Sequence, residues 1–286
     1  MPDNRRFPSM CPDLSAWGPP RFQRPGHIAL ICVNEEGAVL SRRVKERFPS
    51  AQLWGSKEFF PGVGIYGNEL KDFFRKIWPT HAGIVLFGAA GIAVRSAAPY
   101  ITSKLSDPAL VAVDDSGRYA ISLLSGHEGS ANALTEDIAQ FLGAVPVITT
   151  GTETRRRLIA GVGCRKNVKG ERIADALTQT IAAHGYSLSD LYAIAIADIK
   201  MNEPGIHEAA RKLNVQLRIV PRERIRATQD VFQKNDDKNF VETITGVTAV
   251  CEPAAILSSL HSQLKIKKTV PLPGITIALA EDVFGL

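Results

Sequence analysis

The chain has 286 residues, of which 45% are hydrophobic and 22% charged, a composition that excludes a fibre or a largely disordered protein. The length favours two domains over one. The formal net charge of +5 and the sequence pI near 9.0 favour acidic partners. Because the basic residues are spread along the chain with few aromatic residues among them, a polyanionic small molecule fits as well as a nucleic acid.

The cysteines and the hydropathy pattern indicate a cytoplasmic protein. Cys11, Cys32, Cys164 and Cys251 lie far apart, with no CxxC pair and no Cys/His spacing typical of zinc, so we interpret them as reduced thiols and expect no metal site. No apolar segment approaches the roughly 18 residues that a membrane span needs. The N-terminus also lacks the apolar core of a signal peptide.

The first half of the chain begins with residues 1–26, which are rich in Pro and Arg and which we expect to form a flexible tail. His27–Val33 then reads as a strand, followed by a helix-like segment to Phe48 and a short strand at Ala51–Trp54. The literal GxGxxG at Gly62–Gly67 follows a poor strand, so we interpret it as a loop or turn and not as a dinucleotide site.

The stretch from Gly83 to Glu153 is the one around which the chain is organised. It contains four strand-like apolar runs, Ile84–Phe87, Leu110–Val113, Ala120–Leu124 and Val145–Ile148. Small or polar residues gather where each run ends, as they do where strand ends form a site. The densest group, Ser125–Asn132, opens a helix-like segment that continues through Phe141.

The second half repeats the alternation of strands and helices after a polar linker at Thr150–Arg157. The strand-like runs are Leu158–Val162, Tyr192–Ala197, Gln216–Val220, Lys265–Thr269 and Ile275–Ala280. This order predicts two α/β domains with mostly parallel sheets, each built like a three-layer sandwich. We place the domains at residues 27–153 and 154–286.

The turn after Ala120–Leu124 offers the best candidates for acid and base chemistry. An imidazole titrates near neutral pH, so His127 suits proton transfer, and Glu128 would either orient it or act as the base. Alternatively His127 caps a helix. Ser125 does not stand in a GxSxG elbow, which favours a turn or hydrogen-bonding role. Gly126 and Gly129 would present N–H groups to an anion at the start of the helix, with Asn132 in its first turn.

Two cations and two acids flank that turn in the sequence. Arg95 and Lys104 suit the binding of carboxylates, although a solvated helix face explains them equally well. Asp114 and Asp115 would hold a cation, serve as a base or, with Gly117 following, form a hairpin turn, which we favour.

The second half carries its own set of candidates at predicted strand ends. Gly163, Cys164 and Arg165 end the first strand, where open α/β sheets bind ligands. Neighbouring cations would lower the thiol pKa of Cys164, whereas a buried strand-end cysteine is the commoner case. Lys200 and Glu203 end the next strand along the chain and would join the same surface. Glu252 begins a helix, either as a ligand contact or as a cap matched to the helix dipole.

These motifs together resemble a known family. Gly91–Arg95, Ala98-Pro99, Lys104, Asp107–Ala109, Val113-Asp114, Ser122–His127, Ala131-Asn132 and Pro146–Thr150 are similar to the N-terminal domain of the CbiG family of cobalamin (vitamin B12) biosynthesis. The second half resembles the C-terminal domain of that family, which also occurs alone as CobE, at Gly161–Arg165, Lys200–Glu203, Thr245–Val247 and Glu252–Ala254. Family members usually carry a central domain between these two, which this chain lacks.

The resemblance implies a cytoplasmic enzyme of corrin metabolism, a hydrolase acting on a carbon–carbon bond. Cobalt-precorrin-5A hydrolase opens the ring-A lactone and releases acetaldehyde to give cobalt-precorrin-5B. Its partner would be a cobalt-corrinoid polycarboxylate, with no nucleic acid, no membrane and no cofactor beyond the cobalt that the substrate carries. A homodimer and contact with other enzymes of the pathway are left open. The alternative is a corrinoid-binding escort protein that catalyses no step.

Overall fold

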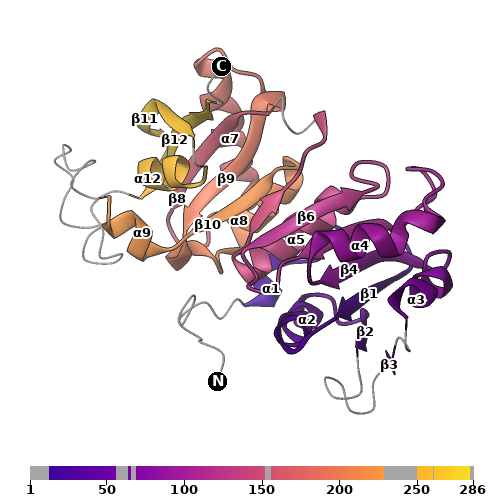
Figure 1. Cartoon of the computed structure of the whole chain (residues 1–286). Helices are drawn as coiled ribbons and strands as arrows, with labels where there is room; N and C mark the ends of the chain where they lie inside the picture. The colour runs from indigo at the N-terminus through magenta and orange to yellow at the C-terminus, as the bar shows by residue number, and fades with distance from the viewer. Residues whose placement is uncertain are drawn as a thin grey trace. The chain divides into compact units, whose positions relative to one another are not determined.

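The computed structural model describes residues 13–55, 64–65, 69–151, 156–228, 250–259 and 261–283. The chain folds as two compact units (Figure 1). One comprises residues 19–150, and the other joins residues 151–286 to the segment that precedes residue 19. The GxGxxG segment lies outside the described residues except for Gly64 and Ile65, which pair as a short strand.

The N-terminal unit is a sheet with helices on both faces. Its strands lie in the order β3-β2-β1-β4-β5-β6-β7. They are β1 (His27–Cys32), β2 (Gln52–Gly55), β3 (Gly64–Ile65), β4 (His81–Phe87), β5 (Ala109–Val113), β6 (Tyr119–Leu124) and β7 (Val145–Val147). Helices α2 (Glu35–Arg47) and α5 (Ala131–Leu142) cover one face. The other face packs on α3 (Leu70–Ile77), α4 (Ala90–Ala97) and the short η2 (Ala98–Tyr100).

Strand direction reverses once in this sheet. The five strands from β3 to β5 are parallel, β5 and β6 are antiparallel, and β7 is parallel to β6. The turn between β5 and β6 is the hairpin expected at Asp114, whose carboxylate accepts the N–H groups of Arg118 and Tyr119 at 2.7 and 2.6 Å. Burial alone would raise the pKa of Asp114, but these hydrogen bonds and the Arg118 side chain lower it.

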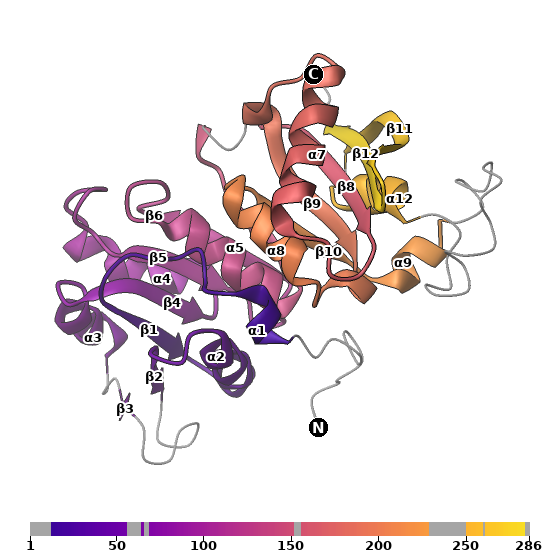
Figure 2. The ribbon, with the colours of Figure 1, turned by 180° about the vertical axis from the view of Figure 1, so that it is seen from behind.

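The C-terminal unit is also three-layered (Figure 2), as the sequence predicts. Its strands lie in the order β10-β9-β8-β12-β11. They are β8 (Leu158–Cys164), β9 (Leu191–Ala197), β10 (Gln216–Val220), β11 (Ser262–Leu272) and β12 (Ile275–Asp282). Helices α7 (Gly170–Ala183) and α8 (Pro204–Lys212) pack on one face. The other face carries α9 (Arg222–Arg226) and α12 (Cys251–Leu257), and the 3₁₀ turns η3 (Leu188–Asp190) and η4 (Asp198–Lys200) flank β9.

Close backbone approach explains two glycines of the C-terminal unit. A Cβ placed on Gly161 of β8 would lie 1.8 Å from the carbonyl oxygen of Cys251 in α12. A Cβ on Gly205 in α8 would lie 1.9 Å from the carbonyl oxygen of Val168. Both helices therefore sit closer to their neighbours than any side chain at these positions would allow.

The expectation of a flexible tail through residue 26 is wrong for residues 13–26, which are ordered by packing. Helix α1 (Leu14–Trp17) belongs to the C-terminal unit, where Trp17 is 3% exposed and stacks on His207 with ring centroids 5.3 Å apart. Arg211 in α8 donates to the carbonyl oxygen of Trp17 at 2.7 Å. The N–H group of Asp13 donates to the Asn202 side chain at 2.9 Å.

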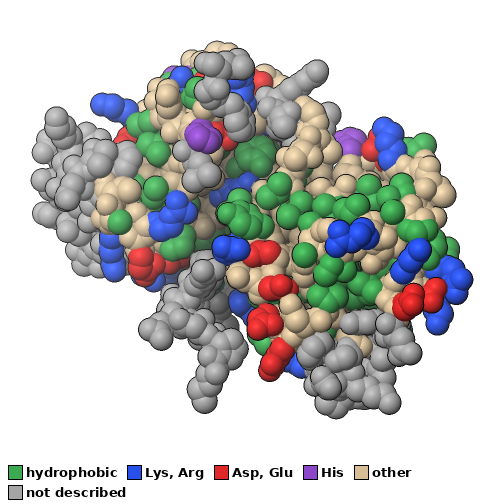
Figure 3. Space-filling model, viewed as in Figure 1, with side chains coloured by type: hydrophobic (Ala, Val, Ile, Leu, Met, Phe, Trp, Pro, Cys, Tyr) green, Lys and Arg blue, Asp and Glu red, His purple; other side chains and the backbone are tan. Residues whose placement is uncertain are grey.

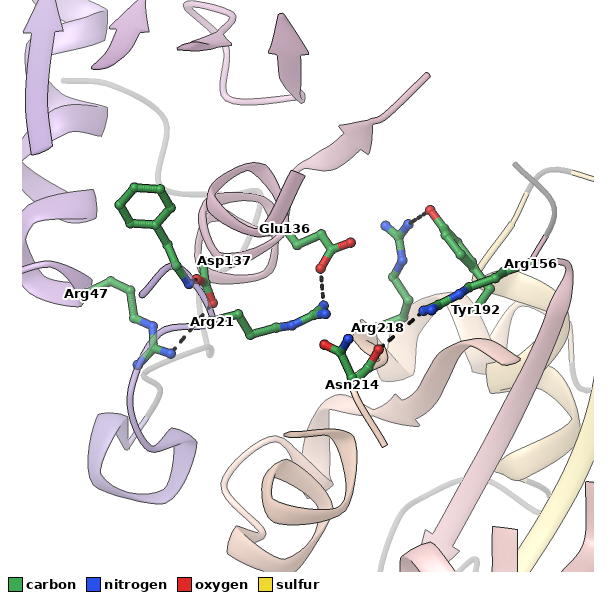
Figure 4. Close-up of polar contacts among 9 residues, drawn as sticks. Arg21, Arg47, Glu136, Asp137, Arg156, Tyr192, Asn214 and Arg218 are labelled. Carbon is green, nitrogen blue, oxygen red and sulfur yellow. Dashed lines mark hydrogen bonds and ion pairs between the residues drawn. The ribbon is translucent and has the colours of Figure 1, made fainter. Parts of the chain in front are cut away.

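Residues 19–26 pack on the N-terminal unit instead. The N–H group of Phe22 donates to the carboxylate of Asp137 in α5 at 2.9 Å, and Arg21 pairs with Glu136 (Figure 4). Arg47 of α2 lies 3.9 Å from the same Asp137 carboxylate. Burial raises the pKa of Asp137, and the hydrogen bond from Phe22 and the nearby arginines only partly oppose that effect.

The same close-up also draws contacts within the C-terminal unit. Arg218 donates to the Tyr192 hydroxyl at 3.1 Å, and Arg156 donates to the carbonyl oxygen of Asn214 at 3.4 Å (Figure 4).

In neither unit do the described residues include a helix with both the length and the apolar character needed to cross a bilayer.

Replacing Trp17 tests whether the N-terminal segment is structural. Because Trp17 fills a buried site against His207, Trp17→Ala should lower the free energy of unfolding of the C-terminal unit by about 3 kcal/mol and speed amide exchange in α8. Phe22→Ala, the matched change in the next segment, removes a buried ring that lies against Gly83 next to Leu134 and should speed exchange in α5 instead. Chemical denaturation and hydrogen exchange measure both effects. If Trp17→Ala changed the free energy of unfolding by less than about 0.5 kcal/mol, the segment would be a flexible tail and not part of the packed structure.

Candidate functional site

The loop between β6 and α5, residues 125–130, is held in a strained conformation. Ser125 and Ser130 adopt left-handed backbone angles with φ of 59° and 65°, which cost non-glycine residues roughly 1–3 kcal/mol each. The Ser125 side chain is buried, and its hydroxyl oxygen has no hydrogen-bond partner among the described residues. Strain and an unpaired buried hydroxyl mark this loop as a candidate site on physical grounds.

The start of helix α5 is closed by the loop and is not an open anion site. The N–H groups of Ala131 and Asn132, the first two in the helix, donate to the carbonyl oxygens of Ser125 and Gly126 at 3.1 and 3.0 Å. An anion would have to displace these bonds. The expectation that the first turn of the helix presents free donors is therefore wrong for these two groups.

The two glycines of the loop serve close packing. A Cβ on Gly126 would lie 2.8 Å from the Thr150 methyl group, and one on Gly129 would lie 2.3 Å from the Ser125 Cβ atom. Asn132 fastens the same region, because its side chain accepts from the Ser122 hydroxyl and donates to the Thr150 hydroxyl, each at 2.8 Å. The loop is thus fixed to the ends of β6 and β7.

His127 and Glu128 are exposed at the tip of the loop. The Lys104 ammonium donates to the Glu128 carboxylate at 2.6 Å, and this hydrogen bond is the main cause of a lowered Glu128 pKa. A carboxylate stabilised in its charged form is a weaker base. Of the two candidate bases, His127 is therefore the better placed to accept a proton.

A second loop, residues 101–108, lies beside the first and is built around Asp107. The Asp107 carboxylate accepts the N–H groups of Thr102 and Ser103 at 2.9 and 3.1 Å and the Thr102 hydroxyl at 2.7 Å. Burial would raise the pKa of Asp107, but these hydrogen bonds lower it. The loop thereby holds Lys104 within reach of Glu128.

Arg24 connects the two loops and was not among the residues that the sequence singled out. Its guanidinium donates to the carbonyl oxygens of Asp107 and Ser106 at 2.6 and 2.9 Å. The same guanidinium packs against Gly129, where an added Cβ would lie 3.0 Å from Nη1. The only hint in the sequence was the clustering of arginines in the segment taken for a tail.

The strand ends of this unit fall at two opposite edges, whereas the sequence suggested one site. Leu110 at the start of β5 pairs with Leu124 at the end of β6, so the loop at residues 125–130 lies at the edge where β5 begins. Gly88, Gly91 and Asp114 lie at the other edge. Arg95 is exposed on α4, and its guanidinium extends back over Gly91.

In the C-terminal unit, parallel strands bring Cys164, Lys200 and Glu203 together, as expected. The Glu203 carboxylate is buried, accepts the N–H group of Asn167 at 2.7 Å and lies 3.7 Å from the Lys200 ammonium. Desolvation raises the pKa of the partly buried Cys164 thiol to about 11, so the alternative of a pKa lowered by neighbouring cations is wrong. The described cysteines, Cys32, Cys164 and Cys251, are free thiols.

The three other candidates of this unit make contacts with β12, with the turn at Gly274 and with β11. Gly163 lies against Thr276 of β12, and Arg165 is exposed beside Gly274, whose carbonyl oxygen accepts the Arg165 N–H at 2.9 Å. Glu252 is buried on the α12 face and accepts the N–H group of Lys268 in β11 at 2.7 Å, a structural tie. Among the residues described, no three His, Cys, Asp or Glu side chains group as metal ligands would.

Comparison with known proteins adds two family matches. Residues 72–153 match the family model described as "Cobalamin synthesis G N-terminal" and residues 158–280 match "Cobalamin synthesis G C-terminus". A cobalt-precorrin-5A hydrolase of Salmonella typhimurium is 26% identical over 352 aligned residues, which cover 90% of this chain and 98% of that protein. One of Priestia megaterium is 29% identical over 139 residues, 46% of this chain and 37% of that protein.

A solved structure is also similar. The crystal structure of CobE, a protein from the cobalamin biosynthetic pathway, is 27% identical and covers 46% of this chain and 93% of its own, with a TM-score of 0.41. The alignment with the S. typhimurium protein is longer than the 286 residues of this chain, so that relative contains residues that this chain lacks.

Adding a methyl group at Gly129 should disrupt the packing that fixes the loop at residues 125–130. The new Cβ would overlap Ser125, so Gly129→Ala should lower the free energy of unfolding by roughly 1–3 kcal/mol and speed exchange of the Ala131 and Asn132 amide hydrogens. Gly151→Ala is the matched control, because nothing lies within 4 Å of its added Cβ. Equal behaviour of the two variants in hydrogen exchange would contradict the packing described.

The ion pair at the loop tip predicts a pKa change. In Lys104→Met the Glu128 pKa should rise toward its ordinary value of about 4.3, because the hydrogen bond that lowers it is gone. In the unchanged protein the pair persists above that value and is lost as pH falls through the lowered pKa. Carboxyl NMR titration measures this, with Lys166→Met as control; an unmoved Glu128 pKa would rule out the pair.

Proposed function

Since the chain belongs to the cobalamin synthesis G (CbiG) family, we propose that it is a cobalt-precorrin-5A hydrolase of cobalamin biosynthesis. Two curated relatives carry that name, and one is matched over nearly its whole length. In the proposed reaction water opens the ring-A lactone, and the exposed alcohol then leaves as acetaldehyde through cleavage of a carbon–carbon bond.

The absence of a central domain does not remove the candidate site. The two family regions are separated by only residues 154–157 in this chain. Lys104, the loop at residues 125–130 and Thr150, which Asn132 binds, all belong to the N-terminal unit. The proposal therefore places the chemistry in a part of the chain that is complete without a central domain.

The observation that carries the proposed mechanism is the strained loop with His127 exposed at its tip. We assign to His127 the removal of a proton from the water that attacks the lactone carbonyl. Opening the lactone gives a carboxylate and an alcohol. The same imidazole, once free of its proton, then accepts the alcohol proton as the carbon–oxygen double bond of acetaldehyde forms and the bonding electron pair passes to the macrocycle.

Lys104, Glu128 and Ser125 have supporting roles in this proposal. The ion pair from Lys104 holds Glu128 beside His127, where a carboxylate stabilises the imidazolium that proton transfer creates. The Ser125 hydroxyl has no other partner among the described residues, and we assign it to the lactone oxygen that develops negative charge.

In this proposal the C-terminal unit supplies no nucleophile. The Cys164 thiol, with a pKa of about 11, is protonated at neutral pH. Lys200 is paired with Glu203, whereas Arg165 is exposed and has no ion-pair partner among the described residues. We propose no resident cofactor, because the cobalt enters as part of the substrate.

Replacing His127 tests the proposal. The unchanged protein, incubated anaerobically with cobalt-precorrin-5A, should release one acetaldehyde per corrinoid with the matching loss of mass. His127→Ala should lower kcat by about 10²–10⁴-fold. His184→Ala, an exposed histidine of the other unit, should leave kcat unchanged. Tight corrinoid binding without acetaldehyde would replace the hydrolase with an escort role, and full activity of His127→Ala would remove this base.

A further inference from the structure

An exposed apolar surface lies next to the candidate site. Of the large hydrophobic side chains exposed in the described part of the chain, Leu105 is 69% exposed, Val94 44% and Ile101 43%. Ala98 and Pro99 between them are also exposed. Figure 3 shows the hydrophobic side chains gathered over α4 on this face, with basic side chains set among them. We call Val94, Ala98, Pro99, Ile101 and Leu105 the apolar ledge.

The outer side of helix α4 is unlike that of an ordinary surface helix. Its exposed residues are Gly91, Val94 and Arg95, followed one turn later by Ala98. Helix α7, which also covers a sheet, instead exposes Glu171, Arg172 and Asp175. A helix that faces water usually carries charged residues on that side, so α4 is built to face something less polar.

Leu105 is held in the open by a loop with little freedom. Three hydrogen bonds to the Asp107 carboxylate and two from Arg24 fix the backbone on both sides of it. A free loop would fold its leucine against the protein surface. Fixing the loop keeps the apolar side chain available and lowers the entropy lost when a ligand binds.

Two cations border the ledge. Arg95 lies beside Val94 on α4, and no carboxylate lies within ion-pair distance of it among the described residues. Lys104, next to Leu105, is 71% exposed and bonds to Glu128 through one oxygen. An apolar surface with cations at its border is complementary to a ligand that has an apolar body and carboxylates around its rim.

We propose that the apolar ledge is the surface on which the macrocycle of the substrate rests, with Arg95 and Lys104 meeting carboxylates at its rim. This inference rests on the proposed function, which supplies a large cobalt-bearing macrocycle as ligand. It adds a binding surface at Val94, Ile101 and Leu105 that places the macrocycle beside the loop carrying His127. A second copy of the chain, the other occupant that such a surface could take, is an outcome of the test.

The double variant Ile101→Gln, Leu105→Gln tests the ledge. Loss of apolar contact should raise KM for cobalt-precorrin-5A and the Kd measured by anaerobic ultrafiltration by roughly tenfold or more, with kcat within about twofold. Both side chains are exposed, so the fold should persist, which circular dichroism checks. Val270→Gln is the matched control, since Val270 is 62% exposed on β11 of the other unit.

The outcomes separate this inference from the proposed function. Turnover by the unchanged protein with the same KM in the double variant would overturn the ledge and leave the hydrolase. Corrinoid binding that the double variant weakens, without acetaldehyde from either protein, would support the ledge and overturn the hydrolase. A dimer in sedimentation velocity that the double variant dissociates at unchanged KM would make the ledge a self-association surface. Neither binding nor turnover by the unchanged protein would overturn both.

Discussion

The reversal of strand direction between β5 and β6 is the constraint on which the candidate site depends. Because β6 runs antiparallel to β5, its end at Leu124 lies opposite the start of β5 at Leu110. The loop at residues 125–130 is thereby carried to the edge where residues 101–108 enter β5. Had β6 continued the parallel order, His127 would have lain at the edge of Gly88 and Asp114, far along the strands from Lys104.

Buried carboxylates convert this topology into a fixed geometry. Asp107 organises residues 101–108, and Arg24 ties that loop to Gly129 in the next one. Phe22 is held in turn by Asp137 of α5. Polar groups removed from water must find partners, so each bond restricts where the neighbouring segment can lie. The N-terminal segment is thus part of the site's framework and not an appendage.

How much the sequence predicts follows from the range of each interaction. Apolar runs and turn residues are local, so the strands, the hairpin at Asp114 and the shared surface of Lys200 and Glu203 were predictable. The reversal of strand direction that this hairpin causes, and its effect on where His127 lies, were not predicted. Trp17 accepts a hydrogen bond from Arg211, 194 residues away, and Arg24 donates one to Asp107, 83 residues away. No periodic pattern in the sequence predicts either contact. The raised pKa of Cys164 likewise depends on burial, which sequence neighbours do not report.

The distribution of charge decides which forces a polycarboxylate ligand would meet. Although the chain is basic overall, several cations at or near the candidate sites are already paired, Lys104 with Glu128, Lys200 with Glu203 and Arg222 with Asp198. Each pair neutralises part of the positive charge and weakens any field that would attract an anion. In our proposal apolar contact then supplies much of the binding free energy, while Arg95 and Lys104 fix the ligand's orientation. The exposed side chains of the apolar ledge are suited to supply that apolar contact.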